Sequence, residues 1–148
     1  MKCLKNKIVI FGAGSFAREA YHLCQVVEVG EVLGFIAPKQ SGNETEKLLP
    51  IKMLGTDGEL SMLIDTLKIN TFVSAIGHPG TRKKCFDHAY NSHLNPKNIK
   101  HPSSVILADL DDVGCVIYPN VTIMNDCNIG RGVLLNSNAS IGHDTKIG

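Results

Sequence analysis

Residues 129–148 read IGRGVLLNSNASIGHDTKIG, and an aliphatic side chain returns at every sixth position of this stretch. The same spacing extends back to Ile99, so that eight of nine consecutive sixth positions are aliphatic and Asp111 is the exception. Ordinary strands and turns do not require a strict period of six, whereas each side of a three-sided parallel β-helix does. The sequence therefore predicts a hexapeptide-repeat β-helix over residues 99–148.

One coil of such a β-helix takes about eighteen residues, so residues 99–148 form fewer than three coils. We expect each aliphatic residue of the repeat, Ile99 and Val105 included, to point inward and stack on the neighbouring coil. The acidic turn at residues 109–112 interrupts the period and predicts an irregular first coil. Cys115 and Cys127 occupy inward positions, which favours buried thiols over reactive ones.

The first 98 residues alternate short apolar runs with helical periodicity. We expect strands at Lys7–Phe11, Val32–Ile36 and Thr71–Ile76, with a short extended segment near Asn98. We expect helices at Ser15–Val29, from a Thr56–Glu59 capping box to Leu67, and from a Thr81 cap to Asn91. A polar loop is expected at residues 38–47. This alternation predicts an α/β fold with a parallel sheet, and hence two domains, 1–98 and 99–148.

A glycine-rich segment follows the first predicted strand. Gly12-Ala13-Gly14-Ser15-Phe16-Ala17 fits the pattern G-x-G-x-x-A between a strand and a helix. Glycines allow a diphosphate to approach the backbone, and the helix N-terminus supplies amide donors. The alternative is a tight turn without a ligand. If a ligand binds, we expect Gly12, Gly14, Ser15 and Phe16 to contact it.

A second candidate loop follows the strand predicted at Thr71–Ile76. Ligands of open parallel sheets bind at the carboxyl ends of the strands, which places Gly77 and His78 within reach of the same ligand. Arg82 and Lys83 can add positive charge near a diphosphate. Solvated residues in the first turn of a helix are an equally good explanation for both cations.

A nicotinamide-dependent oxidoreductase is a weaker alternative. Such enzymes carry an acidic residue after the second strand, about twenty residues beyond the glycines, to hold the ribose hydroxyls. Here that position reads Phe35-Ile36-Ala37-Pro38 and has no carboxylate. The pattern favours a nucleotide that is held mainly by its phosphates.

Composition excludes several classes of protein. The 148 residues are 43% hydrophobic and 20% charged, which does not suit a disordered chain. The net charge is +1 and no basic block is present, so we expect no nucleic-acid partner. No apolar run is long enough for a membrane span or a signal peptide, which predicts no membrane association and a cytoplasmic protein. The five cysteines and six histidines lack metal-ligand spacing, and we expect no metal.

One histidine of the repeat is a candidate for catalysis. His143 lies two residues after the inward Ile141 and should point outward, stacked over Asn125 of the preceding coil. An imidazole can accept a proton at neutral pH, and the adjacent Asp144 can fix its tautomer or stabilise its cation. The alternative is an inert surface histidine.

These segments together resemble the bacterial sugar acyltransferases that include sialic acid O-acetyltransferases and UDP-4-amino-sugar N-acetyltransferases of surface glycan synthesis. The resemblance runs along essentially the whole chain. It rests on IFGAG at residues 10–14, LGTD at 54–57, AIG at 75–77 with Arg82-Lys83, HPS at 101–103 and, most specifically, LNSNASIGHD at 135–144.

The resemblance implies a Rossmann-like N-terminal domain that binds a nucleotide sugar or sugar acceptor. It also implies a left-handed β-helix that forms a homotrimer and binds acetyl-CoA between neighbouring subunits. His143 would then be the general base, Asp144 would orient it, and Asn136 would line the same pocket. The acetyl group would pass directly to an amine or hydroxyl of the acceptor, without a covalent enzyme intermediate.

Two departures from the family pattern stand out. Ser15-Phe16 replaces a frequent Gly-His, and no acidic residue follows the second strand, which leaves the identity of the acceptor open. The chain also stops at Ile147-Gly148, within a hexapeptide, and so has the appearance of a truncated member. A non-catalytic nucleotide-sugar-binding or assembly module is therefore the main alternative to an active acetyltransferase.

Overall fold

A parallel sheet forms the N-terminal half of the computed structural model, which describes residues 6–38 and 47–148. The expected loop at residues 38–47 lies outside the described residues except at its two ends. Every neighbouring pair in the strand order β3-β2-β1-β4-β5 is parallel, as the sequence predicted. The strands are β1 (Lys7–Phe11), β2 (Glu31–Ala37), β3 (Met53–Thr56), β4 (Thr71–Ser74) and β5 (Asn95–Pro96).

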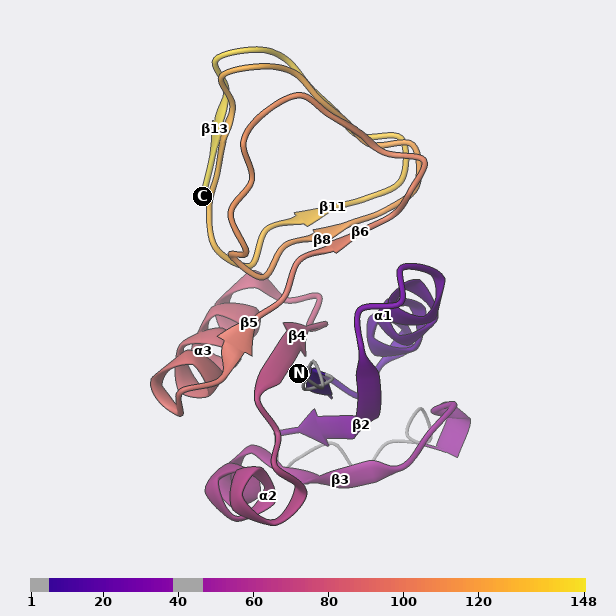
Figure 1. Cartoon of the computed structure of the whole chain (residues 1–148), viewed down its shortest axis with the longest axis vertical. Coiled ribbons are helices and arrows are strands. Elements are labelled where there is room, and N and C mark those ends of the chain that lie inside the picture. The colour runs from indigo at the N-terminus through magenta and orange to yellow at the C-terminus, as the bar shows by residue number, and fades with distance from the viewer. Residues whose placement is uncertain (1–5, 39–46) are drawn as a thin grey trace, which may run out of the picture.

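Helices cover both faces of this sheet (Figure 1). Helix α1 (Ser15–Val26) packs on one face, where Ile8 and Ile10 of β1 meet its buried alanines. Helices α2 (Leu60–Leu67) and α3 (Pro79–Asn91) pack on the other face, which β1 reaches with Val9 and Phe11. The continuous apolar run of β1 follows from this arrangement, because a parallel strand between two helical layers is buried on both sides.

Helix α1 and strand β4 are each shorter than the sequence predicted. Helix α1 ends at Val26 rather than Val29, because the chain turns through Glu28 and Gly30, whose φ values are +50° and +143°. Strand β4 ends at Ser74 rather than Ile76. The structure also adds β3, a short strand that the sequence did not predict; its Gly55 and its four residues give too weak a pattern.

Helix α3 begins three residues before the predicted start. His78, not Thr81, is its N-cap, and the His78 Nδ1 atom accepts a hydrogen bond from the Thr81 amide at 3.3 Å. Pro79 then occupies the first turn, where its missing N–H costs nothing. The predicted Thr56–Glu59 capping box is confirmed: the Glu59 carboxylate accepts from the Thr56 amide at 2.8 Å, and the 3₁₀ turn η2 (Asp57–Glu59) leads into α2.

Residues 99–148 wind into a three-sided coil of two-residue strands (Figure 1). We call its sides one, two and three. Side one consists of β6 (Ile99–Lys100), β8 (Val116–Ile117) and β11 (Leu134–Leu135). Side two consists of β7 (Val105–Ile106), β9 (Thr122–Ile123) and β12 (Ser140–Ile141). Side three consists of β10 (Asn128–Ile129) and β13 (Lys146–Ile147), and all these pairs are parallel.

The register of the coil follows the expected period of eighteen except in the first coil. Leu134 pairs with Val116 and Ser140 with Thr122, eighteen residues apart in each case. In the first coil, however, Val105 pairs with Thr122, which is a step of seventeen. The sequence-based assignment of inward residues is therefore wrong there. Val105 is 52% exposed, and its neighbour Ile106 packs into the coil interior instead.

The buried Asn98 holds this irregular first coil. Its side-chain nitrogen donates to the Asp111 carbonyl, and its side-chain oxygen accepts from the amides of Val113 and Cys115 at 3.2 and 2.9 Å. Ile99, also expected to point into the coil, lies in the core cluster of the N-terminal half together with Val116. Because the first coil is one residue short of eighteen, strand β6 turns Ile99 toward the sheet and not into the coil.

A left-handed backbone residue marks each corner of the coil from Gly114 onward. Positive φ values recur at six-residue intervals, at Gly114, Asn120, Asp126, Gly132, Asn138 and Asp144, with φ between +57° and +76°. Glycine, asparagine and aspartate are the residues that tolerate this conformation best. The corners therefore impose a second period of six, which the sequence carries in phase with the aliphatic one.

Two of the corners are glycine because helix α3 lies against them. A Cβ atom at Gly114 would stand 2.6 Å from a ring carbon of Phe86, and one at Gly132 would stand 3.2 Å from the same ring. The aromatic ring thus occupies the space that a side chain would need at these corners. Phe86 is itself buried in the N-terminal core, so this contact joins the coil to the sheet.

Arg82 fastens the same junction by hydrogen bonds. Its Nε donates to the Gly132 carbonyl at 3.1 Å, and its terminal nitrogen donates to the carbonyls of Ile76 and Gly77, both at 2.9 Å. Burial lowers the pKa of this guanidinium from its ordinary value. The side chain that the sequence placed near a diphosphate therefore joins helix α3 to the loop after β4 and to a coil corner.

Side one of the coil rests on helix α1. Tyr118 follows β8, and its hydroxyl donates to the Glu19 carboxylate at 2.6 Å. Its ring lies 6.1 Å from that of Phe16. Burial and the neighbouring Glu19 raise the pKa of Tyr118, which keeps the hydroxyl protonated and able to donate at neutral pH.

The corner contacts predict that asparagine is tolerated at an open corner and not beneath α3. Gly114→Asn should lower the free energy of unfolding by about 2 kcal/mol, because the new side chain overpacks against Phe86. Asp126→Asn places the same residue at an open corner and should change stability by less than about 0.5 kcal/mol. Urea denaturation followed by circular dichroism measures both, and equal midpoints would contradict this explanation.

A second comparison tests the Arg82 junction. Arg82→Met should cost about 2 kcal/mol or more of unfolding free energy, because three carbonyls lose a charged donor. Lys83→Met changes the next residue, an exposed lysine paired with Asp87, and should cost less than about 0.5 kcal/mol. If the two variants unfold at the same urea concentration, Arg82 does not fasten the two halves.

Candidate functional site

The two predicted loops lie at the same edge of the sheet. Strands β1 and β4 are parallel neighbours, with Phe11 in register with Ser74, so the segments that follow them leave the sheet side by side. The Ala75 amide donates to the Phe11 carbonyl at 2.8 Å, which continues the pairing one residue beyond β4. The structure thereby brings the segment at residues 12–16 and the segment at residues 77–78 to one carboxyl edge.

The three glycines of this edge differ in whether the fold requires glycine at their positions. Gly12 has φ +132°, and a Cβ atom there would stand 2.4 Å from the Ala75 carbonyl oxygen, so the fold itself requires glycine. Gly14 and Gly77 have negative φ, and an added Cβ atom would meet nothing within 4 Å. The fold does not require glycine at these two positions. Their bare backbones are open to an approaching group.

Helix α1 begins at this open backbone. Gly14 is its N-cap, and no side chain caps the first turn. Ser15 is exposed, and its hydroxyl accepts from a terminal nitrogen of Arg18 at 3.1 Å. Ser74 is 2% exposed at the end of β4, and its hydroxyl has no hydrogen-bond partner among the described residues. Unsatisfied donors at a helix N-terminus are suited to binding an anion.

Three of the predicted contact residues also make structural contacts within the chain. His78 caps α3, Arg82 bridges backbone carbonyls, and the Phe16 ring packs beside Tyr118. The contacts of Arg82 with Gly132 and of Phe16 with Tyr118 depend on packing between the N-terminal half and the coil, so the sequence carried no signal of them. The His78 cap is local, and Pro79 at the first helical position was its signal in the sequence. Gly14, Ser15 and Gly77 remain the predicted residues that present open groups at this edge.

The predicted general base, His143, and its partner Asp144 both lie on the coil. His143 Nδ1 is 2.6 Å from Asp144 Oδ2, and both side chains are 72% exposed. Asp144 is a corner residue with φ +57°, and its amide donates to the Asn125 carbonyl of the preceding coil at 3.3 Å. One coil earlier, the Asn125 amide group donates to the Asp126 carboxylate at the equivalent corner. The corner thus fixes the carboxylate, and the residue before it turns its side chain onto that carboxylate.

Asn136 does not join His143 within one chain. It follows β11 and lies two residues before the corner at Asn138, whereas His143 lies beside the next corner, at Asp144. Strand β12 of side two separates the two corners. The corner at Asp144 is also the one opposite side one, which is the side that packs against the N-terminal half (Figure 1). His143 therefore lies away from its own chain's glycine loop.

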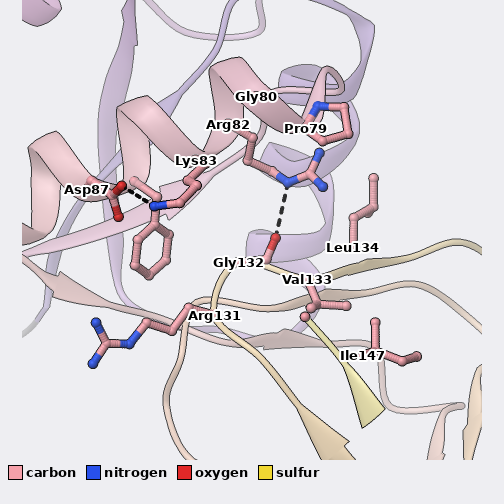
Figure 2. A pocket seen from close by; sticks show the side chains of 12 residues that line it. Pro79, Gly80, Arg82, Lys83, Asp87, Arg131, Gly132, Val133, Leu134 and Ile147 are labelled. Carbon is pink, nitrogen blue, oxygen red and sulfur yellow. Dashed lines mark hydrogen bonds and ion pairs between the residues drawn. The ribbon is translucent and has the colours of Figure 1, made fainter. Parts of the chain in front are cut away.

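A cavity of about 620 Å³, which no sequence pattern indicated, lies between α3 and the coil. Figure 2 shows Lys83 and Arg131 at its rim, with Arg82 bonded to Gly132. Lys83 pairs with Asp87 at 2.5 Å, and the Arg131 guanidinium lies 4.7 Å from the centre of the Tyr90 ring. Both rim cations therefore already have partners.

The described cysteines are all buried free thiols: Cys24, Cys85, Cys115 and Cys127. Burial raises the pKa of Cys24 to about 12 and that of Cys115 to about 11, which keeps both thiols protonated. Cys3 lies outside the described residues. Within residues 6–38 and 47–148, no group of three His, Cys, Asp or Glu side chains is placed to hold a metal. The helices of these same residues include none with the length and hydropathy of a membrane span.

Solved structures share this fold. PerB from Caulobacter crescentus, in complex with CoA and GDP-perosamine, matches with a TM-score of 0.79 at 23% identity over 95% of this chain and 65% of its own. The acetyltransferase domain of PglB from Neisseria gonorrhoeae FA1090 matches with a TM-score of 0.73 at 16% identity over 95% of this chain and 67% of its own. At these identities the likeness shows the fold.

Sequence comparison gives the family. GDP-perosamine N-acetyltransferase of Escherichia coli O157:H7 is 30% identical over 97% of this chain, which spans 65% of the length of that relative. The model of the PglD N-terminal domain matches residues 7–89, more than half of the chain. The predicted resemblance to sugar acetyltransferases is confirmed, and the chain belongs to the PglD N-terminal domain family.

Proposed function

We propose that this protein acts in the transfer of an acetyl group from acetyl-CoA to an amine or hydroxyl of a nucleotide sugar used in surface glycan synthesis. The observation that carries this proposal is the hydrogen-bonded His143–Asp144 pair, fixed at a coil corner in a chain with the sheet of the PglD N-terminal domain family. In this proposal residues 1–98 bind the acceptor, and residues 99–148 begin a left-handed β-helix that assembles as a homotrimer in the cytoplasm.

The open glycine edge supports binding of a nucleotide sugar. The fold does not require glycine at Gly14 or Gly77, and the backbone at both positions is open. The amides at the start of α1 have no side-chain cap. A diphosphate supplies the negative charge and the acceptor oxygens that such a helix start binds. The buried Ser74 hydroxyl, which has no partner among the described residues, is a further donor at the same edge.

In the proposed reaction His143 first takes a proton from the acceptor and then gives it to the departing thiolate. With Nδ1 hydrogen-bonded to Asp144, the other ring nitrogen, Nε2, is left to accept a proton from the acceptor amine or hydroxyl. The acceptor atom bonds to the thioester carbonyl carbon, the carbon–sulfur bond breaks, and the proton on Nε2 passes to the departing thiolate. Asp144 stabilises the imidazolium that forms between these transfers.

Acceptor binding can be tested without disturbing the fold. Gly14→Ala should weaken binding of UDP- or GDP-linked amino sugars by about tenfold or more, because the methyl group occupies the space through which the ligand approaches. Isothermal titration calorimetry measures the affinity. Gly58→Ala, in η2, adds a methyl group at another roomy glycine and should bind like the wild type. Unchanged affinity in Gly14→Ala would remove this edge from the proposal.

The catalytic role rests on the His143 imidazole. His143→Ala should lower acetyl transfer by about 100-fold or more while acceptor affinity stays unchanged, since a general base contributes to the rate by this order. Release of free CoA thiol, followed with a thiol-reactive dye, measures the rate. Wild-type protein that releases no thiol with any candidate acceptor would favour a non-catalytic binding module.

Two matched variants separate loss of the base from a disturbance of the coil corner that holds it. Asn125→Ala truncates the equivalent residue of the preceding coil and should leave the rate unchanged. Asp144→Asn keeps a side chain that tolerates the left-handed corner and removes the carboxylate, so it should slow transfer without lowering stability. If Asn125→Ala slowed transfer as much as His143→Ala, the loss would come from the coil and not from the base.

A further inference from the structure

The cavity between helix α3 and the coil shares no lining residue with the proposed active site. One wall is the first part of α3, at residues 79–87, and the other is the coil segment at residues 131–134 with Ile147 of β13. Neither the open glycine edge nor the His143–Asp144 pair contributes to these walls. The volume of about 620 Å³ lies within the range of small-molecule sites, so the cavity can hold a ligand of its own.

Cationic side chains stand on both walls of this cavity. Figure 2 shows Lys83 extending from α3 and Arg131 extending from the coil, and Arg82 lines the cavity as well. Among the described side chains that line it, Asp87 carries the one negative charge. Three positive charges therefore face a single carboxylate, which favours an anionic ligand.

Each of these cations keeps donors that no described residue uses. The Arg131 guanidinium is held by its face, 4.7 Å from the centre of the Tyr90 ring, which leaves the N–H groups at its edge for an acceptor. Arg82 donates through Nε and one terminal nitrogen, and its other terminal nitrogen has no partner among the described residues. Lys83 has three N–H donors and bonds to Asp87 alone.

The ion pair at the rim can exchange its partner for an anion. The side chains of Lys83 and Asp87 are 76% and 52% exposed, and ion pairs at such exposed positions contribute little to stability. An entering anion can therefore replace the Asp87 carboxylate beside the Lys83 ammonium group without unfolding the helix. Arg82, in contrast, is fixed by backbone carbonyls and adds a preorganised charge.

Most of the remaining lining is apolar. Phe86 and Val133 are buried, and Leu134 and Ile147 are half-buried. This surface suits the hydrocarbon or aromatic part of a ligand, while the cations suit its charged group. The lining as a whole therefore indicates an amphipathic anion.

We propose that this cavity binds a phosphate monoester of an apolar or aromatic alcohol, with the phosphate between Lys83 and Arg131 and the organic group against Phe86 and Val133. A phosphate monoester carries close to two negative charges at neutral pH and has three acceptor oxygens, so it engages donors from both walls at once. A carboxylate has one charge and two oxygens. The inference goes beyond the proposed function and does not depend on it, because the two sites share no residue.

Isothermal titration calorimetry with phenyl phosphate tests the class of ligand. Phenyl phosphate should bind once per chain and about tenfold or more tighter than inorganic phosphate, which lacks the ring, or benzoate, which lacks the second charge. Because the ester contacts both α3 and the coil in the native state, a saturating concentration should also raise the urea midpoint. Absence of binding overturns the proposal, and benzoate that binds as tightly as phenyl phosphate overturns the assignment to phosphate.

Substitutions at the rim test the position of the ligand. Lys83→Met and Arg131→Gln should each weaken phenyl phosphate binding by about tenfold, because each removes a charged donor. Lys84→Met removes the neighbouring exposed lysine of α3, which does not line the cavity, and should leave the affinity unchanged. Asp87→Asn should strengthen binding, since the ammonium group of Lys83 no longer has a competing carboxylate. An equal loss in Lys84→Met would show general surface attraction and overturn the site.

Two controls separate this cavity from the fold and from the open glycine edge. The substituted side chains at the rim are exposed, so the variants should keep the wild-type urea midpoint without ligand, and lost binding then reports on the site. Gly14→Ala should bind phenyl phosphate as tightly as the wild type, although it should bind nucleotide sugars more weakly. Loss of phenyl phosphate binding in Gly14→Ala would place the ester at the glycine edge and overturn the cavity.

Discussion

The structure depends on a backbone constraint at the corners of the coil. Each of the six corners from Gly114 to Asp144 has a residue with positive φ, and the spacing of six residues between them fixes the length of the sides that they bound. Only glycine, asparagine and aspartate tolerate this conformation readily, and all six corners carry one of them. The inward aliphatic residues supply the burial that stabilises the coil, while the corners determine where each side ends and which side chains point outward.

Which of those three residues occupies a corner depends on what that corner contacts. Glycine stands at the two corners that meet Phe86, where an added Cβ atom would clash with the ring at Gly114 and crowd it at Gly132. Asparagine and aspartate stand at the other corners. There Asp126 and Asp144 are hydrogen-bonded to the residue before them, and Asn138 accepts a hydrogen bond from the Asn120 side chain of the preceding coil. The His143–Asp144 pair is one instance of this arrangement, with an imidazole in the place that Asn125 takes one coil earlier. A structural turn thereby holds the proposed general base.

The sequence predicted the regular part of this arrangement and could not predict the irregular part. The period of six from Ile117 to Ile147 needs no tertiary information, and the alternation of strands and helices before it predicted the parallel sheet. The step of seventeen in the first coil depends on the buried Asn98, and β3 depends on pairing with β2, so neither has a local signal. The hydrogen bond from Arg82 to the Gly132 carbonyl likewise comes from tertiary packing, whereas the His78 cap is a local contact with Thr81. The six-residue series of corner residues was visible in the sequence and would have located Asp144 at a turn.

The central claim is that Asp144 holds the imidazole of His143 with Nδ1 protonated and Nε2 free to accept a proton. Long-range ¹⁵N–¹H correlation spectra of the protein at a pH where the ring is neutral measure the tautomer of His143 directly, with the other histidines as internal references. We expect the chemical shifts of a protonated Nδ1 and an unprotonated Nε2 in the wild type, and loss of this preference in Asp144→Asn. A ring protonated at Nε2 in the wild type would contradict the assignment of His143 as the general base.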